Sequence, residues 1–264
     1  MKIAITGALG RMGRSVLESV QACSDTVLSV ATVPVGSPAA GKDYGAALNL
    51  APIGIVLQSQ LNDQFDVLID FTTPEASLSH VAFCRKQGKA IVLGTTGFSP
   101  AQQTLLQEAG QDCPIFWSPN MSIGIYVLEQ LVTQAATLLK NFKNKDIDIL
   151  DVHHRHKKDA PSGTALKLGE CIAKTLGLDL MQAKFDGLQG QARQENSIGF
   201  TVRRSAEIVG EHTAIFNFPS EQIQLSHVAH SRQVFAEGAV QIAQWLKNQP
   251  AGYYSMQDFM ARSS

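Results

Sequence analysis

A short apolar strand runs directly into three glycines at the start of the chain, in the sequence MKIAITGALGRMG. The glycines occupy positions 7, 10 and 13, and the following residues predict a helix over Arg14–Ala22 and a second strand over Val27–Val33. A glycine turn between a strand and a helix lets a pyrophosphate approach the helix amino terminus, where unpaired amides and the helix dipole favour negative charge. This arrangement predicts a doubly wound, Rossmann-like parallel sheet that binds a dinucleotide.

The end of the predicted second strand bears on the choice of cofactor. In dinucleotide sites an acidic residue there usually binds the adenosine ribose, but this chain has Thr32, Val33 and Pro34. No arginine replaces the acid to bind a 2′-phosphate, although Lys42 or Arg11 could supply the charge. We therefore expect the chain to accept both NADH and NADPH, or to prefer NADPH.

Strands and helices continue to alternate after this point, as in a doubly wound sheet. The predicted elements are a strand at Val67–Phe71, a helix at Glu75–Gln87, a strand at Ala90–Leu93, a helix at Pro100–Ala109 and a strand at Pro114–Trp117. Ligands of such sheets bind outside the carboxyl ends of the strands. Candidate cofactor contacts are therefore Phe71, Thr72, Gly94, Thr95, Thr96 and Asn120, although Gly-Thr-Thr-Gly is also an ordinary loop sequence.

The sequence changes character after Ser122, where a long apolar helix pattern begins. Later segments predict longer alternating strands, at Asp146–His154, Ile198–Arg203, Ile208–Phe218 and Gln222–His230. They indicate a second, α+β domain with a mixed or antiparallel sheet. Helices at Val234–Leu246 and Met256–Met260 are expected to pack back on the first domain. We therefore expect one domain of residues 1–124 and 235–264, which binds the dinucleotide, and a second of residues 125–234.

Residues 153 to 164, HHRHKKDAPSGT, gather cations and imidazoles between a strand that ends at His154 and a helix predicted over Thr164–Gly177. Ser162 is a candidate N-cap, and Gly163 would let a ligand approach the first helix amides. Cations beside a helix amino terminus suit a small anionic substrate. A charge run alone is more often a solvated loop, but strand alternation sends adjacent histidines to opposite faces. One of the two is therefore expected to be partly buried or to line a cleft.

Composition limits the partners of the chain. The 264 residues are 44% hydrophobic, which is ordinary for a soluble globular protein. Their formal net charge of -1 gives no overall field that would attract nucleic acid or an acidic membrane. Cys23, Cys84, Cys113 and Cys171 form no Cys-x-x-Cys pair, so neither a zinc knuckle nor a disulfide framework is expected. No signal peptide or membrane span is recognisable, and we expect a cytoplasmic protein with reduced thiols.

Several short motifs stand along the chain: GALGRMG, GTTG, SPNMSIG, HHRHKKDAPSGTA, IGF and IVGEHTAIF. Together they resemble the dihydrodipicolinate reductase family, also called the 4-hydroxy-tetrahydrodipicolinate reductases, over nearly the whole chain. The resemblance implies an NAD(P)H-dependent oxidoreductase of the diaminopimelate route to lysine, in which hydride passes from the nicotinamide to a cyclic, unsaturated dicarboxylic imine. It also implies a homotetramer assembled through the sheet of the second domain, which would bind the substrate as well.

The resemblance assigns roles to residues by position. His153 matches the catalytic acid/base of the family and Lys157 its proton donor, while His154, Gly163 and Thr164 match its substrate-carboxylate contacts. The residues that match its cofactor contacts are Gly7, Ala8, Leu9, Gly10, Arg11, Met12, Gly94, Thr95, Thr96, Ser118, Pro119, Asn120 and Met121. No metal is expected.

Three sites depart from the family pattern. Val33-Pro34 replaces an acid-bearing strand tip, which weakens only the inference on cofactor choice. Met121 and Tyr126 stand where the family often has phenylalanine and asparagine, and we interpret them as packing variants.

The expected chemistry needs an acid near the substrate, because hydride addition leaves electron density on the ring that a proton must quench. We expect the like charges of Arg155, His156 and Lys158 to make the Lys157 ammonium a readier acid, and which of His153 and Lys157 delivers the proton stays open. We further expect the substrate to lie between Lys157, His154 and the first amides of the helix. The nicotinamide would lie over it from the first domain, and closure of the domains would exclude water.

Two other functions stay open at this stage. A metal-dependent hydrolase could use His153, His154 and His156, but no carboxylate stands at a recognised ligand spacing and the neighbouring cations would repel a metal ion. A nucleotide-sensing module could keep the glycine motif without turnover.

Overall fold

The computed structural model describes residues 1–185, 190 and 192–261. The chain forms two compact units, one of Met1–Met121 with Arg232–Ser264 and one of Ser122–Ser231. Each boundary lies three residues before the expected position, at 121 instead of 124 and at 231 instead of 234. At the first boundary the reason is local, because the Ser122 side chain caps a helix and so belongs with it. In the described part of the chain, no helix has both the length and the apolar character needed to cross a membrane.

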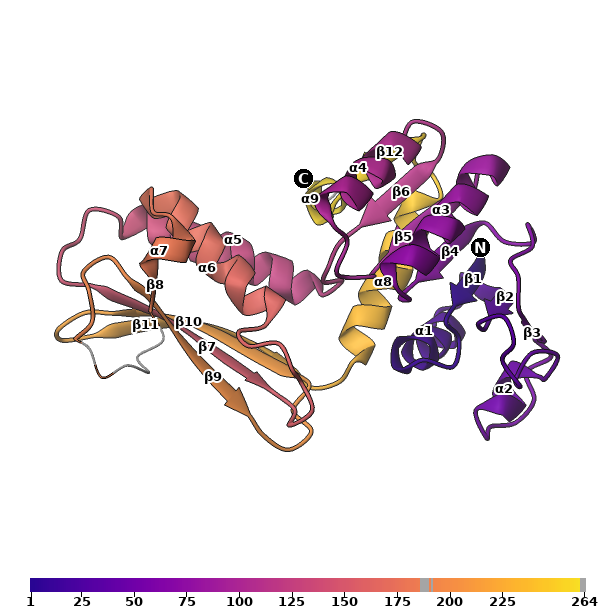
Figure 1. Cartoon of the computed structure of the whole chain (residues 1–264), viewed down its shortest axis with the longest axis horizontal. Coiled ribbons are helices and arrows are strands. Elements are labelled where there is room, and N and C mark those ends of the chain that lie inside the picture. The colour runs from indigo at the N-terminus through magenta and orange to yellow at the C-terminus, as the bar shows by residue number, and fades with distance from the viewer. Residues whose placement is uncertain (186–189, 191, 262–264) are drawn as a thin grey trace. The chain divides into compact units, whose positions relative to one another are not determined.

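The first unit is built on a seven-stranded sheet with the order β12-β6-β5-β4-β1-β2-β3 (Figure 1). Its strands are β1 (Lys2–Thr6), β2 (Val27–Thr32), β3 (Leu57–Gln58), β4 (Val67–Asp70), β5 (Ala90–Leu93), β6 (Pro114–Trp117) and β12 (Gly252–Tyr254). All neighbouring strands pair in parallel. The strand β1 lies inside the sheet, with β2 and β3 on one side and β4, β5, β6 and β12 on the other. This order confirms the predicted Rossmann-like sheet. The carboxyl ends of the parallel strands therefore meet along one edge.

The helices of the first unit are α1 (Arg11–Ala22), α2 (Tyr44–Ala47), α3 (Pro74–Gln87), α4 (Pro100–Ala109), α8 (Gln233–Leu246) and α9 (Met256–Ala261). Both α3 and α4 begin with proline behind a capping hydroxyl, from Thr73 and Ser99 respectively. The late helix α8 packs on α1 and against β4, β5 and β6, as expected from the sequence. The strands β4 and β5 are buried along their whole length, as parallel strands covered on both faces are.

The sequence pattern predicts the long elements within three residues of their observed ends, but it does not predict α2, β3 or β12. These elements have four, two and three residues, too few to display a helical or alternating period. β3 and β12 form the two edges of the sheet, where they pair with β2 and β6. Their position therefore depends on strands that are already in place.

The second unit consists of a five-stranded sheet with helices over one of its faces (Figure 1). Its elements are α5 (Ile123–Leu138), β7 (Asp146–His153), α6 (Gly163–Leu176), α7 (Leu180–Ala183), β8 (Lys184–Phe185), β9 (Ile198–Arg204), β10 (Gly210–Asn217) and β11 (Gln222–Ala229). The strand order is β11-β10-β7-β9-β8, with antiparallel pairs from β11 to β7 and parallel pairs from β7 to β8. The sheet is therefore mixed, as predicted.

Alternation along β10 separates the two faces of this sheet. From Gly210 to Phe216 every second residue is buried, and the residues between them are half exposed. The buried face packs against α5 and α6 through apolar side chains, among them Ile149, Ala214, Phe216, Val132, Leu168 and Ile172. Within the described residues of this unit, no helix covers the other face. The buried face is the one that carries Asp151, His153 and His212.

Candidate active site

The glycine turn after β1 has a backbone that accepts no larger residue. Gly7 has a φ of +62°, and a Cβ there would lie 2.9 Å from the methyl carbon of Thr72. A Cβ on Gly13 would lie 2.4 Å from the carbonyl oxygen of Ala8. The helix α1 begins directly after Gly10, which has no side chain to cap it. The first-turn amides of a helix lack an intrahelical acceptor, so this turn fits the pyrophosphate of a dinucleotide.

Tyr44, which belongs to no recognised motif, holds this turn from inside the unit. Its side chain is fully buried, and its hydroxyl donates to the carbonyl oxygen of Ala8 at 2.6 Å and lies 3.1 Å from that of Gly13. Burial raises the pKa of Tyr44, so the phenol stays protonated and remains a donor. The amide of Ala8 donates to the carbonyl oxygen of Thr32 at 3.0 Å, which ties the turn to β2 as well.

A second buried network joins the loops after β4 and β5. The fully buried carboxylate of Asp70 accepts hydrogen bonds from the amide of Thr72 at 2.8 Å and from its hydroxyl at 2.6 Å. The Nδ1 atom of His80 lies 2.7 Å from the other carboxylate oxygen. The hydroxyl of Thr95 accepts from the Thr72 amide at 3.0 Å. Because Thr72 also packs against Gly7, these bonds hold the strand-end loops against the glycine turn.

The predicted cofactor contacts follow β1, β5 and β6, whose carboxyl ends lie at one edge of the sheet. Those at least partly exposed are Gly7, Leu9, Gly10, Arg11, Met12, Gly94, Thr96, Pro119 and Asn120. Those buried are Ala8, Thr95, Ser118 and Met121. Phe71 lies with its ring against Gly94, where a Cβ would come within 2.0 Å of a ring carbon. The buried residues are placed to support the exposed ones.

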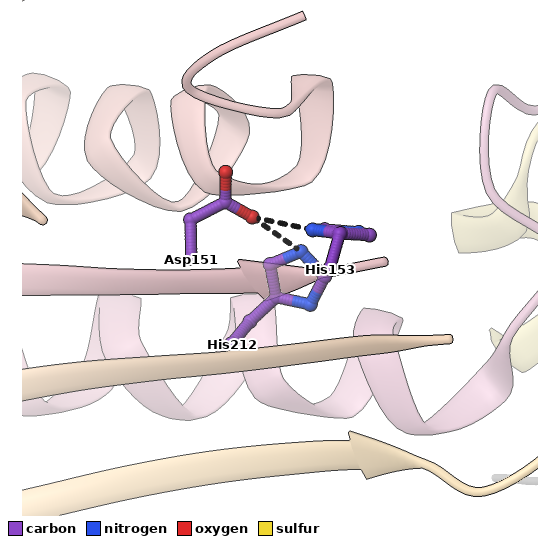
Figure 2. A group of neighbouring side chains, drawn as sticks. All are labelled: Asp151, His153 and His212. Carbon is purple, nitrogen blue, oxygen red and sulfur yellow. Dashed lines mark ion pairs between the residues drawn. The ribbon is translucent and has the colours of Figure 1, made fainter. Parts of the chain in front are cut away.

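In the second unit, the helix-covered face of the sheet brings Asp151, His153 and His212 together (Figure 2). Asp151 and His153 are two residues apart on β7, so their side chains share a face. His212 on β10 is the cross-strand partner of Asp151. The Oδ1 atom of Asp151 lies 2.9 Å from Nδ1 of His153 and 3.5 Å from Nε2 of His212. The first contact lies within ion-pair distance but is not aligned as a hydrogen bond.

Asp151 also binds the start of α6. Its Oδ2 atom accepts from the amide of Ser162 and its Oδ1 atom from the Ser162 hydroxyl, both at 2.8 Å. The same hydroxyl accepts from the amide of Ala165 at 3.2 Å, so Ser162 is the N-cap that the sequence predicts. Arg204 of β9 places its Nη2 atom 3.2 Å from Oδ2. The carboxylate therefore meets an imidazole, an amide, a hydroxyl and a guanidinium.

These surroundings set the charges of the cluster. Burial alone would raise the pKa of Asp151, but its contacts with His153 and Ser162 outweigh burial and hold that pKa well below the ordinary value. Burial lowers the pKa of His212 to about 3, and the neighbouring His153 adds to the shift. Asp151 is therefore ionised and His212 neutral at neutral pH.

The rest of the basic segment lies outside the buried cluster. His153 is the buried member of the histidine pair and His154 the partly exposed one, which confirms that alternation separates them. The Nζ atom of Lys157 lies 3.0 Å from Oδ1 of Asp159. The turn therefore brings an acid from two residues away to the ammonium group, in addition to the like charges that the sequence places nearby.

The amino terminus of α6 is open on its outer side. Its first residue, Gly163, is exposed, and a Cβ there would meet no atom within 4 Å. Thr164 follows and is partly exposed. The space beside Gly163 is therefore open at the positive end of the helix dipole, next to the basic segment, which suits a carboxylate.

Asp151, His153 and His212 form the one group of three potential metal ligands among the described residues. Both oxygens of Asp151 already accept hydrogen bonds, and the guanidinium of Arg204 lies 3.2 Å from one of them. A metal cation here would face that guanidinium, so we assign no metal to the group. The alternative of a hydrolase with three histidine ligands is not supported, because His154 and His156 lie outside it.

Sequence reasoning misses several residues of this site. The Asp-x-His spacing of Asp151 and His153 is a signal that was available, since residues two apart in a strand share a face. Arg204 has no local signal, and His212 lies in the motif IVGEHTAIF, to which sequence reasoning gives no role in the site. They come from β9 and β10, and only the pairing register places them beside β7.

The regions of the chain that match known proteins include both units. Residues 1–121 match the family description "Dihydrodipicolinate reductase, N-terminus", and residues 124–260 match "Dihydrodipicolinate reductase, C-terminus". A protein of Hahella chejuensis named 4-hydroxy-tetrahydrodipicolinate reductase is 46% identical over 264 residues, with 98% of each chain covered. One of the same name from Pseudomonas fluorescens is 45% identical over 265 residues, again with 98% of each chain covered. A solved structure, a dipicolinate-bound dihydrodipicolinate reductase from Paenisporosarcina sp., shares the fold with a TM-score of 0.73, 23% identity and 97% of each chain covered.

The buried phenol of Tyr44 should matter for cofactor affinity. Tyr44→Phe leaves the carbonyl groups of Ala8 and Gly13 without this donor, so the glycine turn loses support worth about 1 kcal/mol, or roughly fivefold in Kd for the reduced cofactor. Fluorescence titration with NADH and NADPH measures this. Tyr126→Phe in α5 is the matched control and should leave Kd unchanged. A lower melting temperature with unchanged Kd would contradict a role in holding the turn.

The neutral His212 should make the stability of the protein depend on pH. Its folded-state pKa of about 3 lies below the ordinary value of 6.5, so the unfolded chain binds a proton in this window that the folded chain does not. The free energy of unfolding then has its full value above pH ~6.5, and it falls by up to about 1.4 kcal/mol per pH unit toward pH ~3. Asp151, whose pKa is lowered, contributes to this loss below the ordinary carboxyl range near pH ~4.

Urea unfolding of wild type and of His212→Gln between pH 6.5 and 4.5, at one protein concentration, tests this dependence. His212→Gln should flatten the decline. His156→Gln, an exposed change in the same protein, should retain the wild-type slope. Equal slopes in all three proteins would show that His212 is not the group responsible.

Proposed function

Because the chain belongs to the dihydrodipicolinate reductase family, NAD(P)H-dependent enzymes that reduce 4-hydroxy-tetrahydrodipicolinate in lysine biosynthesis, we propose that its segment from His153 to Thr164 binds and protonates this substrate. The observation that carries the proposal is the position of His153. It stands buried at the end of β7, beside the N-cap of an open helix amino terminus and next to the basic segment. Binding of a dicarboxylate and delivery of a proton are thus supported by neighbouring groups.

The first unit is the part that binds the nucleotide. The reduced nicotinamide, when bound, supplies the hydride of the reaction. We assign the pyrophosphate to the first amides of α1 and the glycine turn, and the remaining contacts to residues 94–96 and 118–121. The support is the glycine geometry, which leaves room for a ligand at backbone distance, and the networks around Tyr44 and Asp70 that hold it.

The second unit is proposed to bind the substrate. The amides of Gly163 and Thr164 would receive one carboxylate at the positive end of the α6 dipole, and His154 and Lys157 would supply hydrogen bonds and charge. Asp159 pairs with Lys157 at 3.0 Å, so an arriving carboxylate competes with it for the ammonium. Binding of substrate would therefore exchange one carboxylate partner of Lys157 for another. Hydride transfer then requires the nicotinamide of the first unit and this site to meet on the same substrate.

The proton is proposed to come from His153 or Lys157. His153→Gln and Lys157→Met should each lower kcat by about 10²-fold, as expected when a positioned acid is lost, because both act after the cofactor has bound. The measurement is a coupled assay that generates the unstable substrate and follows the loss of NADPH absorbance, with Kd for NADPH determined separately. Lys158→Met and His156→Gln, at exposed neighbours, are controls that should turn over like wild type. Equal losses in turnover and cofactor affinity would contradict these roles.

Cofactor choice is proposed to follow from the strand tip at residues 32–34, which lacks an acid. NADPH should support a kcat/KM at least as high as that with NADH, because no carboxylate repels its 2′-phosphate. Pro34→Asp, at an exposed position, should lower kcat/KM with NADPH by about tenfold, or ~1.4 kcal/mol, and spare NADH. Pro38→Asp in the same loop is the control. A large preference of the wild type for NADH would count against the proposal.

The assembly is proposed to be a homotetramer formed through the face of the second sheet that no described helix of that unit covers. This face presents half-exposed residues of β10 and, on β11, Val228, which is 47% exposed and pairs with Glu211. Light scattering should give about four times 28.5 kDa. The lysine of Val228→Lys can pair with Glu211 within one chain, so this variant should stay folded but form smaller species. Leu138→Lys on α5 is the control and should leave the tetramer intact. A wild-type mass of a single chain would refute this assembly.

The setting is proposed to be the cytoplasm, and the partner a small molecule instead of nucleic acid or a membrane. All four cysteines are free thiols, which fits a reducing compartment.

A further inference from the structure

We propose that Asp151 is a positioning residue that couples the proton donor of the reaction to the place where a substrate carboxylate binds. Its carboxylate contacts His153 on one side and the amino terminus of α6 on the other (Figure 2). The inference rests on the proposed roles of His153 and of the Gly163 and Thr164 amides. Asp151 itself stays out of contact with the substrate, but it determines the orientation of both His153 and the two amides.

On the His153 side, the carboxylate determines which ring nitrogen exchanges a proton. The Nδ1 atom lies 2.9 Å from Oδ1 of Asp151, and a negative charge this close favours a proton on that nitrogen even without an aligned hydrogen bond. The Nε2 atom lies over Gly210, where a Cβ would come within 3.1 Å of it. The ring of His212 packs edge-on at 5.0 Å between centroids. The His153 ring is therefore held on three sides, with Nε2 as the atom that gives up the catalytic proton.

On the α6 side, the same carboxylate determines how the helix starts. Its two oxygens accept from the hydroxyl and the amide of Ser162, both at 2.8 Å. The hydroxyl then accepts from the amide of Ala165 at 3.2 Å. These bonds enclose Gly163 and Thr164, so the direction of their amides depends on Asp151 as well as on the helix. A rotation of the carboxylate would move the proton donor and the anion site together.

Asp151, Arg204 and His212 balance their charges without His153. The Ser162 hydroxyl donates to Asp151, so Nε2–H of His212, 3.2 Å away, donates to that hydroxyl and His212 needs no charge. Asp151 and Arg204, 3.2 Å apart, cancel each other's charge. A protonated His153 then adds one positive charge, which a bound substrate carboxylate balances.

The test is Asp151→Asn in the full-length enzyme, alone and combined with His153→Gln. The amide keeps the size of the carboxylate but carries no charge and turns an NH₂ group toward one of its former donors. We expect kcat to fall at least about tenfold, a part of the ~10²–10⁴-fold that a positioned acid contributes. KM for the dicarboxylate substrate should rise, and Kd for NADPH should stay at the wild-type value.

The pH profile of kcat gives a readout that lost stability alone would not move. The charged or titratable groups that the structure places against His153 are Asp151, Arg204 and His212. Without the carboxylate, the protonated ring loses its counter-charge, so the basic limb of the profile should shift to lower pH in Asp151→Asn. Ser162→Ala keeps the carboxylate and should leave this limb in place. An unshifted limb in Asp151→Asn would overturn the proposal.

The double variant separates failure of this inference from failure of the proposed function. In the His153→Gln background, Asp151→Asn should lower kcat by less than about threefold more, because the residue then has no donor to position. Losses that multiply would overturn the coupling and make Asp151 a structural residue. A His153→Gln enzyme with wild-type kcat would overturn the role of His153, and the coupling with it.

Ser162→Ala keeps the inference testable if Asp151→Asn fails to fold. It removes the hydroxyl link to α6 and leaves the contact between Asp151 and His153 in place. It should raise KM for the substrate more than it lowers kcat. An unchanged KM would contradict the proposed link between the carboxylate and the anion site.

Discussion

A buried carboxylate must be paired, and the second unit is arranged around that requirement at Asp151. A charge taken out of water costs several kcal/mol unless hydrogen bonds and an opposite charge offset it. Asp151 meets the requirement with groups from three elements: His153 of its own strand, Arg204 of β9 and Ser162 at the start of α6. The basic segment between β7 and α6 is thereby fixed at both ends. Its middle can then present cations to an anion while its ends stay rigid.

The glycine turn of the first unit depends on buried polar groups in the same way. Small residues allow the close approach of a ligand, but they supply no side chains that could hold the backbone in place. Tyr44 and Asp70 hold the backbone instead. The Tyr44 hydroxyl donates to the turn, and Asp70 orders the loop at Thr72, which packs on Gly7. In both units, a buried group that need not touch a ligand supports backbone that does.

Local patterns predicted much of this molecule. Alternating strands and helices indicated the parallel sheet, and period-two strands after Asp146 indicated the mixed one, because both periods are visible within a single element. Ser162 was recognisable as a cap for the same reason. The short elements α2, β3 and β12 were not recognisable, since elements of two to four residues show no period and form against neighbours. The contact of Asp159 with Lys157 is not predictable from their spacing of two residues, because the direction of the Asp159 side chain depends on the turn.

Neighbouring residues along the chain are enough to specify the glycine turn, the capped helix after the basic segment and the shared face of Asp151 and His153, since each depends on residues a few positions apart. The residues that complete the sites are brought in by the packed fold. His212 faces Asp151 because β10 pairs with β7 in one register, and a shift by one residue would turn it to the opposite face. Arg204 and Tyr44 likewise reach their partners across long stretches of chain. Contacts of this kind depend on strand pairing and packing, which no local sequence pattern encodes.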